Sequence, residues 1–193
     1  MADLKYAVKI LKKLKVESTE MFFGDLGPIY EWRLEGHADA GHKSLPDQIS
    51  SCGGFVILIS NPKQKVKSVV TWRSKKLKRT ASSSTDAEGQ ATNEVVDHTA
   101  YVKNLILELL GDEVRQIPVH IFTDSENFYQ SVTGTNWVEN PRVRSEVTKV
   151  RESMDRKETD EFHLVPGKQM IADCLTKKGA PADRLMKMLR KGL

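Results

Sequence analysis

The chain has 193 residues, a length that at about 150 residues per domain predicts one domain with an appendage. Apolar residues make up 39% and charged residues 29% of the chain, with a mean hydropathy of −0.45. These values exclude disordered, collagen-like and disulfide-scaffold proteins. The longest apolar run, residues 55–59, is too short to cross a bilayer. Two distant cysteines, Cys52 and Cys174, have no metal-type spacing and predict reduced thiols in an intracellular setting.

The net charge of +4 is distributed unevenly along the chain. Residues 48–85 contain eight basic and no acidic residues, which leaves 22 basic and 26 acidic residues elsewhere. A basic segment on an acidic body is typical of proteins that bind a polyanion such as nucleic acid. A lysine-rich strand edge that blocks aggregation would give the same pattern, so both interpretations stay open. The candidate nucleic-acid contacts in the segment are Trp72, Arg73, Lys75, Lys76, Lys78 and Arg79.

The first half of the chain predicts an amphipathic helix followed by three strands. Residues 3–15 carry leucine, valine and alanine on one stripe and lysines on the other, so we interpret residues 1–20 as the appendage and 21–193 as the domain. Alternating aromatic and apolar residues after a Gly-Pro turn predict a strand that ends at Asp39. Residues 54–60 and 67–73 form a predicted hairpin, so three consecutive antiparallel strands are expected.

The second half alternates helices and strands. We predict a long helix over residues 86–110, ended by Gly111. The later predictions are a strand over 117–124, helices over 126–132 and 143–154, a strand over 162–165, and helices over 169–177 and 182–189. This order indicates an α/β domain in which helices cover a mixed sheet.

Four carboxylates occupy positions that fold stability alone does not require. Asp39 and Asp124 end predicted strands, where the functional crevice of α/β sheets lies. Glu88 falls on the inward stripe of the long helix, although a capping box with Thr85 would also explain it. Asp173 begins a predicted helix, where it could simply favour the helix dipole.

If these four side chains converge, a cation must offset their repulsion. Clustered carboxylates raise one another's pKa unless positive charge neutralises them. Hard oxygen ligands favour Mg²⁺ or Mn²⁺, and paired ions of this kind promote in-line phosphodiester cleavage. The basic segment would serve such chemistry by binding phosphates.

The sequence motifs around the acids resemble those of the ribonuclease H domain of copia-type long-terminal-repeat retrotransposons. Residues 71–76 read TWRSKK and residues 83–88 read SSTDAE, similar to the family's W-x-S-K-K-Q and S-S-T-E-A-E. Residues 34–40, LEGHADA, resemble L-x-G-Y-S-D-A, and residues 121–125, IFTDS, resemble the strand ending in T-D-S. Val-Pro at 165–166 followed by IADCLTK at 171–177 resembles V-P-x-x-x-x-L-A-D-x-F-T-K.

The resemblance implies a ribonuclease H-like fold with a five-stranded mixed sheet flanked by helices. It implies an enzyme that hydrolyses the RNA strand of RNA–DNA hybrids with two Mg²⁺ ions, or Mn²⁺ as substitute, and leaves 5′-phosphate ends. The implied catalytic and metal-binding residues are Asp39, Glu88, Asp124 and Asp173. Ser125 and Asn127 would contact the hybrid, or else cap the helix that starts there.

The resemblance also implies a biological setting. Residues 1–20 resemble the end of the reverse transcriptase and connection segment, so the reverse transcriptase portion of the same polyprotein is an expected partner. The expected location is the cytoplasm, within a retrotransposon particle, with the nucleus as a second location; no membrane contact is expected.

Departures from the family pattern keep an alternative open. The family continues D-A-D-W-A-G-D where this chain has Ala40, Gly41, His42 and Lys43 after Asp39, and residues 166–171 lack the mobile histidine found in many ribonucleases H. A catalytically silent module that binds nucleic acid or protein on this fold is therefore the second hypothesis. An integrase-like nuclease is the third, and the motifs at 71–76 and 83–88 disfavour it.

Overall fold

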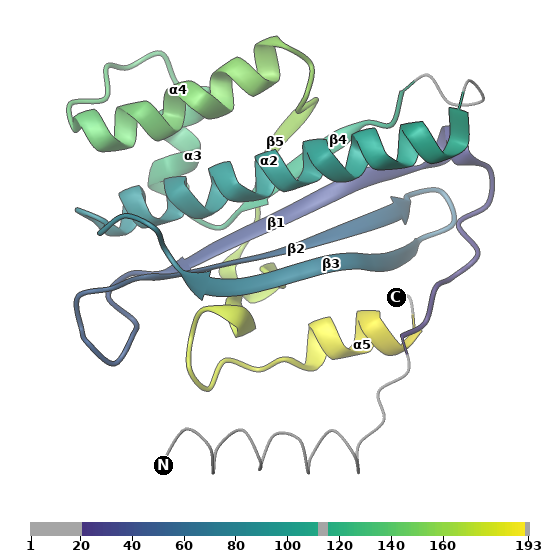
Figure 1. Ribbon diagram of the computed structural model, residues 1–193, viewed down its shortest axis with the longest axis horizontal. Helices are drawn as coiled ribbons and strands as arrows, with labels where there is room; N and C mark the ends of the chain where they lie inside the picture. The colour runs from purple at the N-terminus through teal and green to yellow at the C-terminus, as the bar shows by residue number, and fades with distance from the viewer. Residues whose placement is uncertain (1–20, 112–115, 192–193) are drawn as a thin grey trace.

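The computed structural model describes residues 21–111 and 116–191, and within them five strands form one mixed sheet (Figure 1). The strands are β1 (Arg33–Gly41), β2 (Cys52–Asn61), β3 (Val66–Lys76), β4 (Val119–Thr123) and β5 (Glu161–Leu164). Their order in the sheet is β3-β2-β1-β4-β5. The pairs β1–β2 and β2–β3 are antiparallel, whereas β1–β4 and β4–β5 are parallel. The predicted α/β class, the mixed sheet and the three consecutive antiparallel strands are thus confirmed.

Helices lie on both faces of this sheet. The helices are α2 (Ser84–Leu110), α3 (Glu126–Thr133), α4 (Pro141–Asp155) and α5 (Asp183–Lys191). Short 3-10 turns are η1 (Ile29–Glu31), η3 (Gly167–Gln169) and η4 (Asp173–Leu175). Helix α2 runs along one face with α4 beyond it, and the C-terminal segment with α5 lies beneath the other face (Figure 1). The predicted helix over residues 3–15 and the proposed appendage 1–20 lie outside the described residues.

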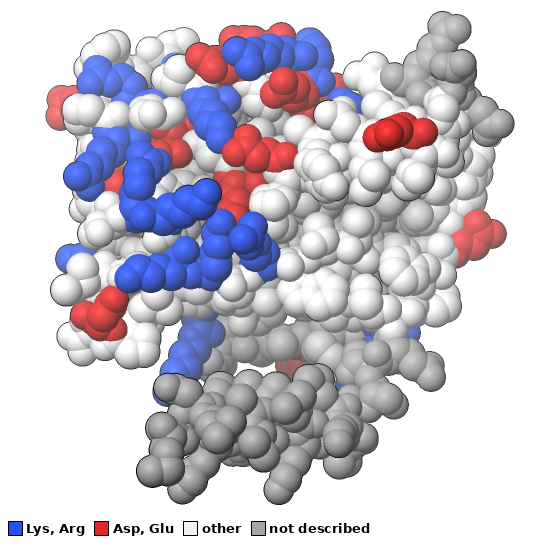
Figure 2. Space-filling view, viewed as in Figure 1, with Lys and Arg blue, Asp and Glu red and all other residues white. Residues whose placement is uncertain are grey.

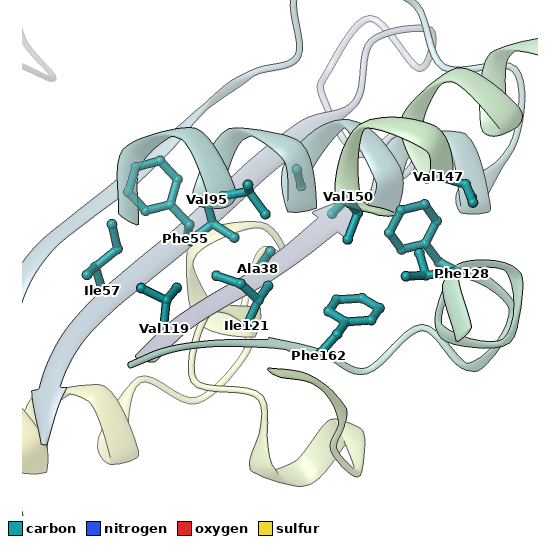
Figure 3. Packing of buried hydrophobic residues seen from close by; sticks show 14 of the residues in the cluster. Ala38, Phe55, Ile57, Val95, Val119, Ile121, Phe128, Val147, Val150 and Phe162 are labelled. Atoms are coloured by element: carbon teal, nitrogen blue, oxygen red, sulfur yellow. The ribbon is translucent and has the colours of Figure 1, made fainter. Parts of the chain in front are cut away.

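The larger core fills the space between the sheet and α2. Strand alternation turns Ala38 of β1 and Ile121 of β4 toward α2, whose Val95 packs against them (Figure 3). Phe128 of α3 and Val147 of α4 extend this cluster, and Phe128 is fully buried. Burial of such a side chain contributes about 2–3 kcal/mol. This core holds α2 over β1 and thereby positions Glu88, which lies in the second turn of that helix.

A second core lies on the opposite face and positions the C-terminal segment. Val56 and Leu58 of β2 face Leu185 and Met188 of α5 in a cluster that also contains residues 170–172. Helix α5 therefore packs residues 170–172, which lie between η3 and η4, against the sheet. No helix in the described ranges is both long and apolar enough to span a membrane.

Two local predictions are wrong. The helix expected over residues 169–177 is instead a pair of 3-10 turns, η3 and η4, separated by Met170 to Ala172, which are buried in the second core. The capping box of Thr85 and Glu88 does not form, because α2 starts earlier, with Ser83 as the N-cap accepting a hydrogen bond from the Asp86 amide at 3.1 Å. Helix capping therefore does not explain the presence of Glu88 on the inward face of α2.

Candidate acidic site at the strand ends

Two of the four predicted acids meet because β1 and β4 are parallel neighbours. Asp39 lies near the C-terminal end of β1 with its side chain fully buried, and Asp124 follows the last residue of β4. Parallel neighbouring strands end at the same edge of a sheet, where α/β proteins bind ligands. Both carboxylates consequently occupy one end of the sheet.

Asp173 reaches the same place from the C-terminal segment. It opens η4, directly after the apolar residues 170–172 that pack into the second core. One oxygen each of Asp39, Asp124 and Asp173 lies within 4.8 Å of the others. Residues from three distant parts of the chain thus form one compact group of oxygen atoms.

Glu88 lies beside this group rather than within it. Its carboxyl group lies close enough to the backbone amide of Ala40 and to the charges of Asp39 and Asp124 for all three to influence its pKa. Its oxygen Oε2 is buried without a hydrogen-bond partner among the residues that the structure describes. Buried oxygens without a partner are costly in a folded protein, so this atom indicates an interaction that the polypeptide itself does not supply.

The four acids create a surplus of negative charge. Burial, followed by the charges of Asp39 and Asp124, raises the pKa of Glu88 to about 9. Burial and the charge of Asp39 also raise the pKa of Asp124 above its usual value. The site on its own therefore favours a proton on Glu88 at neutral pH over four carboxylate charges.

Two residues that sequence reasoning missed complete the site. The Thr176 hydroxyl donates a hydrogen bond to Asp39 Oδ2, and the Lys177 ammonium contacts Asp173 Oδ1 and lies 3.4 Å from Asp39 Oδ1. Partial burial would lower the pKa of Lys177, but the hydrogen bond to Asp173 and the charge of Asp39 raise it overall. Both residues belong to the motif 171–177. Because a helix was predicted there, their orientation toward Asp39 was not expected.

The donor set fits a hard divalent cation. Asp39, Asp124 and Asp173 offer carboxylate oxygens at close range, and Glu88 adds a buried oxygen that lacks a partner. Carboxylates are the ligands that Mg²⁺ and Mn²⁺ prefer. The predicted metal-binding role of the four acids is thus compatible with their arrangement, and it stays a prediction.

The basic segment divides between the two faces of the sheet. Trp72 pairs with Val56, which faces α5, whereas Arg73 pairs with Phe55, which faces α2. Lys76 consequently shares the face of Trp72, and Lys75 shares that of Arg73. The six candidate contacts therefore do not form one continuous surface.

On the α2 face, basic and acidic side chains alternate. Figure 2 shows Lys and Arg gathered over the end of β3 and the first half of α2, with acidic residues among them. Arg73 and Lys75 contact Glu94, and Arg79 contacts Glu146. An open pocket of about 310 Å³ lies there, lined among others by Lys78. Part of the positive charge is thus already balanced within the protein.

The two remaining candidates lie on or near α3. Ser125 is the N-cap of α3 and accepts a hydrogen bond from the Phe128 amide at 3.4 Å. Asn127 lines an open polar pocket that also includes Thr85 of α2 and the exposed Trp137. Ser125 therefore has a structural role, whereas Asn127 faces an open pocket whose lining includes none of the four acids.

Comparisons with known proteins identify the fold. No family model and no curated protein matches the chain. A solved structure of RNase H1 from the halophilic archaeon Halobacterium salinarum matches with 17% identity and a TM-score of 0.51, over 75% of this chain and 94% of its own.

LC11-RNase H1, isolated from compost by a metagenomic approach, matches with 17% identity and a TM-score of 0.53, over 80% of this chain and 98% of its own. The same protein solved with an RNA/DNA hybrid matches with 16% identity and a TM-score of 0.52, over 80% and 99%. The chain therefore has a ribonuclease H-like fold, as predicted.

Proposed function

We propose that this protein is a metal-dependent ribonuclease H that hydrolyses the RNA strand of RNA–DNA hybrids. The observation that carries the proposal is the convergence of Asp39, Asp124 and Asp173 within 4.8 Å at the strand ends, with Glu88 beside them. The ribonuclease H-like fold supports it, because structures of this fold include an enzyme solved with an RNA/DNA hybrid.

The acids would hold two divalent cations, with Mg²⁺ proposed from the carboxylate donors and Mn²⁺ as a substitute. Such cations, when bound, help water attack a phosphodiester and stabilise the charge on the leaving oxygen, which leaves a 5′-phosphate. Thr176 orients Asp39 through its hydrogen bond. Lys177 balances part of the charge of Asp39 and Asp173.

The motifs support a finer assignment within this function. Residues 71–76, 83–88 and 171–177 resemble the copia-type wording, which favours a retrotransposon enzyme acting with the reverse transcriptase portion of its polyprotein during reverse transcription. The corresponding location would be a cytoplasmic particle. The hybrid would be recognised by groove shape and 2′-hydroxyls, because an A-like duplex offers little sequence information to side chains.

The decisive experiment measures cleavage of labelled nucleic acids by the full chain. An RNA–DNA hybrid, double-stranded RNA, double-stranded DNA and single-stranded RNA are each incubated with Mg²⁺, Mn²⁺ or a chelator. We expect cleavage of the RNA strand in the hybrid alone, dependent on metal. Asp39→Asn should reduce the rate by about 10³-fold or more, equivalent to about 4 kcal/mol of barrier.

A matched control separates this effect from a general loss of charge. Asp155 is an exposed acid at the end of α4 and is not part of the acidic group, so Asp155→Asn should cleave like the parent. If the parent binds hybrid without cutting it under every metal condition, the silent module becomes the better explanation, because altered residues follow Asp39.

A further inference from the structure

A second group of metal-ligating side chains lies at the opposite end of β4, apart from the acidic site. His120 of β4 and Glu161 and His163 of β5 project from the sheet face that is turned away from α2. The parallel register places His120 beside Glu161, and His163 is the next residue of β5 on that face. His120 lies four residues before Asp124, about 13 Å along an extended strand.

Three atoms of this group form a tight triangle. His163 Nε2 lies 3.0 Å from His120 Nδ1 and 3.0 Å from Glu161 Oε2, and His120 Nδ1 lies 3.5 Å from the same Glu161 oxygen. Ligands of a tetrahedral zinc ion, at bond lengths of about 2.1 Å, are about 3.4 Å from one another. The three atoms therefore already have nearly the separations that a shared metal ion requires.

Packing holds these rings in place. The His163 ring stacks on Phe122 with centroids 4.8 Å apart, and Phe122 stacks on His37 at 4.5 Å. The His120 side chain is 13% exposed, whereas those of His163 and Glu161 are 34% and 58% exposed. One ligand is thus mostly buried, and the other two are more exposed on the edge strand of the sheet, which gives an ion a path of entry.

We propose that His120, Glu161 and His163 form a second metal site, which binds Zn²⁺ or a similar borderline divalent ion and ties β5 to β4. Two imidazole nitrogens and one carboxylate oxygen suit such ions, and they do not suit Mg²⁺. Three protein ligands leave a fourth position for water. Strand β5 has only four residues and a single neighbour in the sheet, so a metal bridge would reinforce the weakest strand.

The test uses the full chain carrying Asp39→Asn, so that the acidic site is disabled. Zn²⁺ is titrated against a chromophoric chelator in excess Mg²⁺, and Co²⁺ is titrated by visible absorption. We expect one Zn²⁺ per chain, a tetrahedral-type Co²⁺ spectrum, and a rise in the temperature of unfolding with added Zn²⁺. His120→Ala and His163→Ala should each weaken Zn²⁺ binding by about tenfold or more.

Two further variants make the result interpretable. Glu161→Gln keeps the shape of an exposed side chain and should still weaken binding, which separates ligand loss from misfolding. His98→Ala is the matched control, because among the described residues His98 pairs with Glu94 at 3.8 Å and belongs to no group of three metal-ligating side chains. The proposal is overturned if the parent binds no Zn²⁺ in excess Mg²⁺, or if His98→Ala and His163→Ala weaken it equally. A purely hydrogen-bonded histidine pair would give the first of these results.

Discussion

Two buried carboxylates on the same strand and the same face of β1 have opposite surroundings. Glu35 and Asp39 are both 0% exposed and lie four residues apart. The carboxylate of Glu35 contacts positive and polar groups. Its oxygens lie 2.6 Å from Lys67 Nζ, 2.7 Å from Arg33 Nη2 and 2.6 Å from the Ser60 hydroxyl. Asp39 lies beside further carboxylates, with the Thr176 hydroxyl and one half-exposed ammonium as its polar and positive contacts.

The pKa shifts around these two residues run in opposite directions. Burial alone would raise the pKa of Glu35, but contact with His37, the charge of Lys67 and the Ser60 hydrogen bond lower it well below its usual value. At the end of the strand, burial and neighbouring acids raise the pKa of Glu88 to about 9. The fold thus surrounds one buried acid with positive and polar groups and places the other group of acids beside one another, with Lys177 as a cation in contact with two of them.

Breaking the neutralised pair should have the largest effect on stability. Glu35→Gln leaves Lys67 and Arg33 beside a neutral side chain and should reduce the free energy of unfolding by about 3 kcal/mol, measured by urea denaturation. Glu152→Gln, at an exposed pair on α4, should change it by less than about 0.5 kcal/mol. Equal effects of the two substitutions would remove the distinction between a buried structural acid and a surface acid.

The acidic site should make stability fall as pH rises. Glu88 is protonated in the folded protein up to about pH 9, whereas the unfolded chain releases this proton near 4.5. The unfolded state binds fewer protons between these values, so the free energy of unfolding decreases across them, by at most about 1.4 kcal/mol per pH unit. Glu88→Gln should flatten this slope and stabilise the metal-free protein by about 2 kcal/mol at pH 8. Unchanged denaturation curves from pH 5 to pH 9 would contradict the prediction.

Removing the internal cation should strengthen metal binding. A divalent ion held by Asp39 and Asp173 would compete with the Lys177 ammonium that contacts both carboxylates, so Lys177→Ala should lower the dissociation constant for Mg²⁺ by about tenfold, or 1.4 kcal/mol. Calorimetric titration measures this directly. Lys178→Ala, next in the chain and exposed, provides the control. Weaker Mg²⁺ binding by Lys177→Ala would show that the ammonium supports the ion instead of competing with it.

The smallest effect concerns the basic surface. Lys75 contacts Glu94, whereas Lys78 has no salt bridge within the described part of the chain. An unpaired lysine that contacts a phosphate changes the log-log salt dependence of binding by about one unit, so Lys78→Ala should flatten the slope for hybrid binding more than Lys75→Ala does. Equal slopes for both variants and the parent would favour a solvated strand edge without phosphate contacts.

The sequence predicted the parts of the site that depend on local pattern. Asp124 follows the β-branched and aromatic run 119–123, and Asp39 closes the alternating pattern of the first predicted strand. Glu88 shares its stripe of α2 with Ala91, Val95 and Val102, which marks it as an unusual carboxylate there. The element order indicated a mixed sheet, and the structure adds that β1 and β4 are parallel neighbours, which brings the two aspartates to one edge.

Features that depend on tertiary contacts were not predictable. Residues 169–177 have a helical pattern, yet docking of residues 170–172 into the second core and the hydrogen bond from Thr176 to Asp39 select 3-10 turns. The counter-ion role of Lys177 depends on the same docking. The run of basic residues suggested one continuous basic surface, but side chains alternate along β3, so Lys75 and Lys76 point to opposite faces of the sheet.

The contact between Thr176 and Asp39 joins residues 137 positions apart, and this sets the order of events during synthesis. Domains fold as their chain emerges, from the N-terminus onward. Strands β1 to β3 can pair early, but Asp173 arrives only after nearly all of the sheet has been made. A chain interrupted before the second core closes would have the fold's central strands and an incomplete set of acids. Synthesis of the segment that contains residues 170–177 is therefore required before the proposed nuclease site is complete.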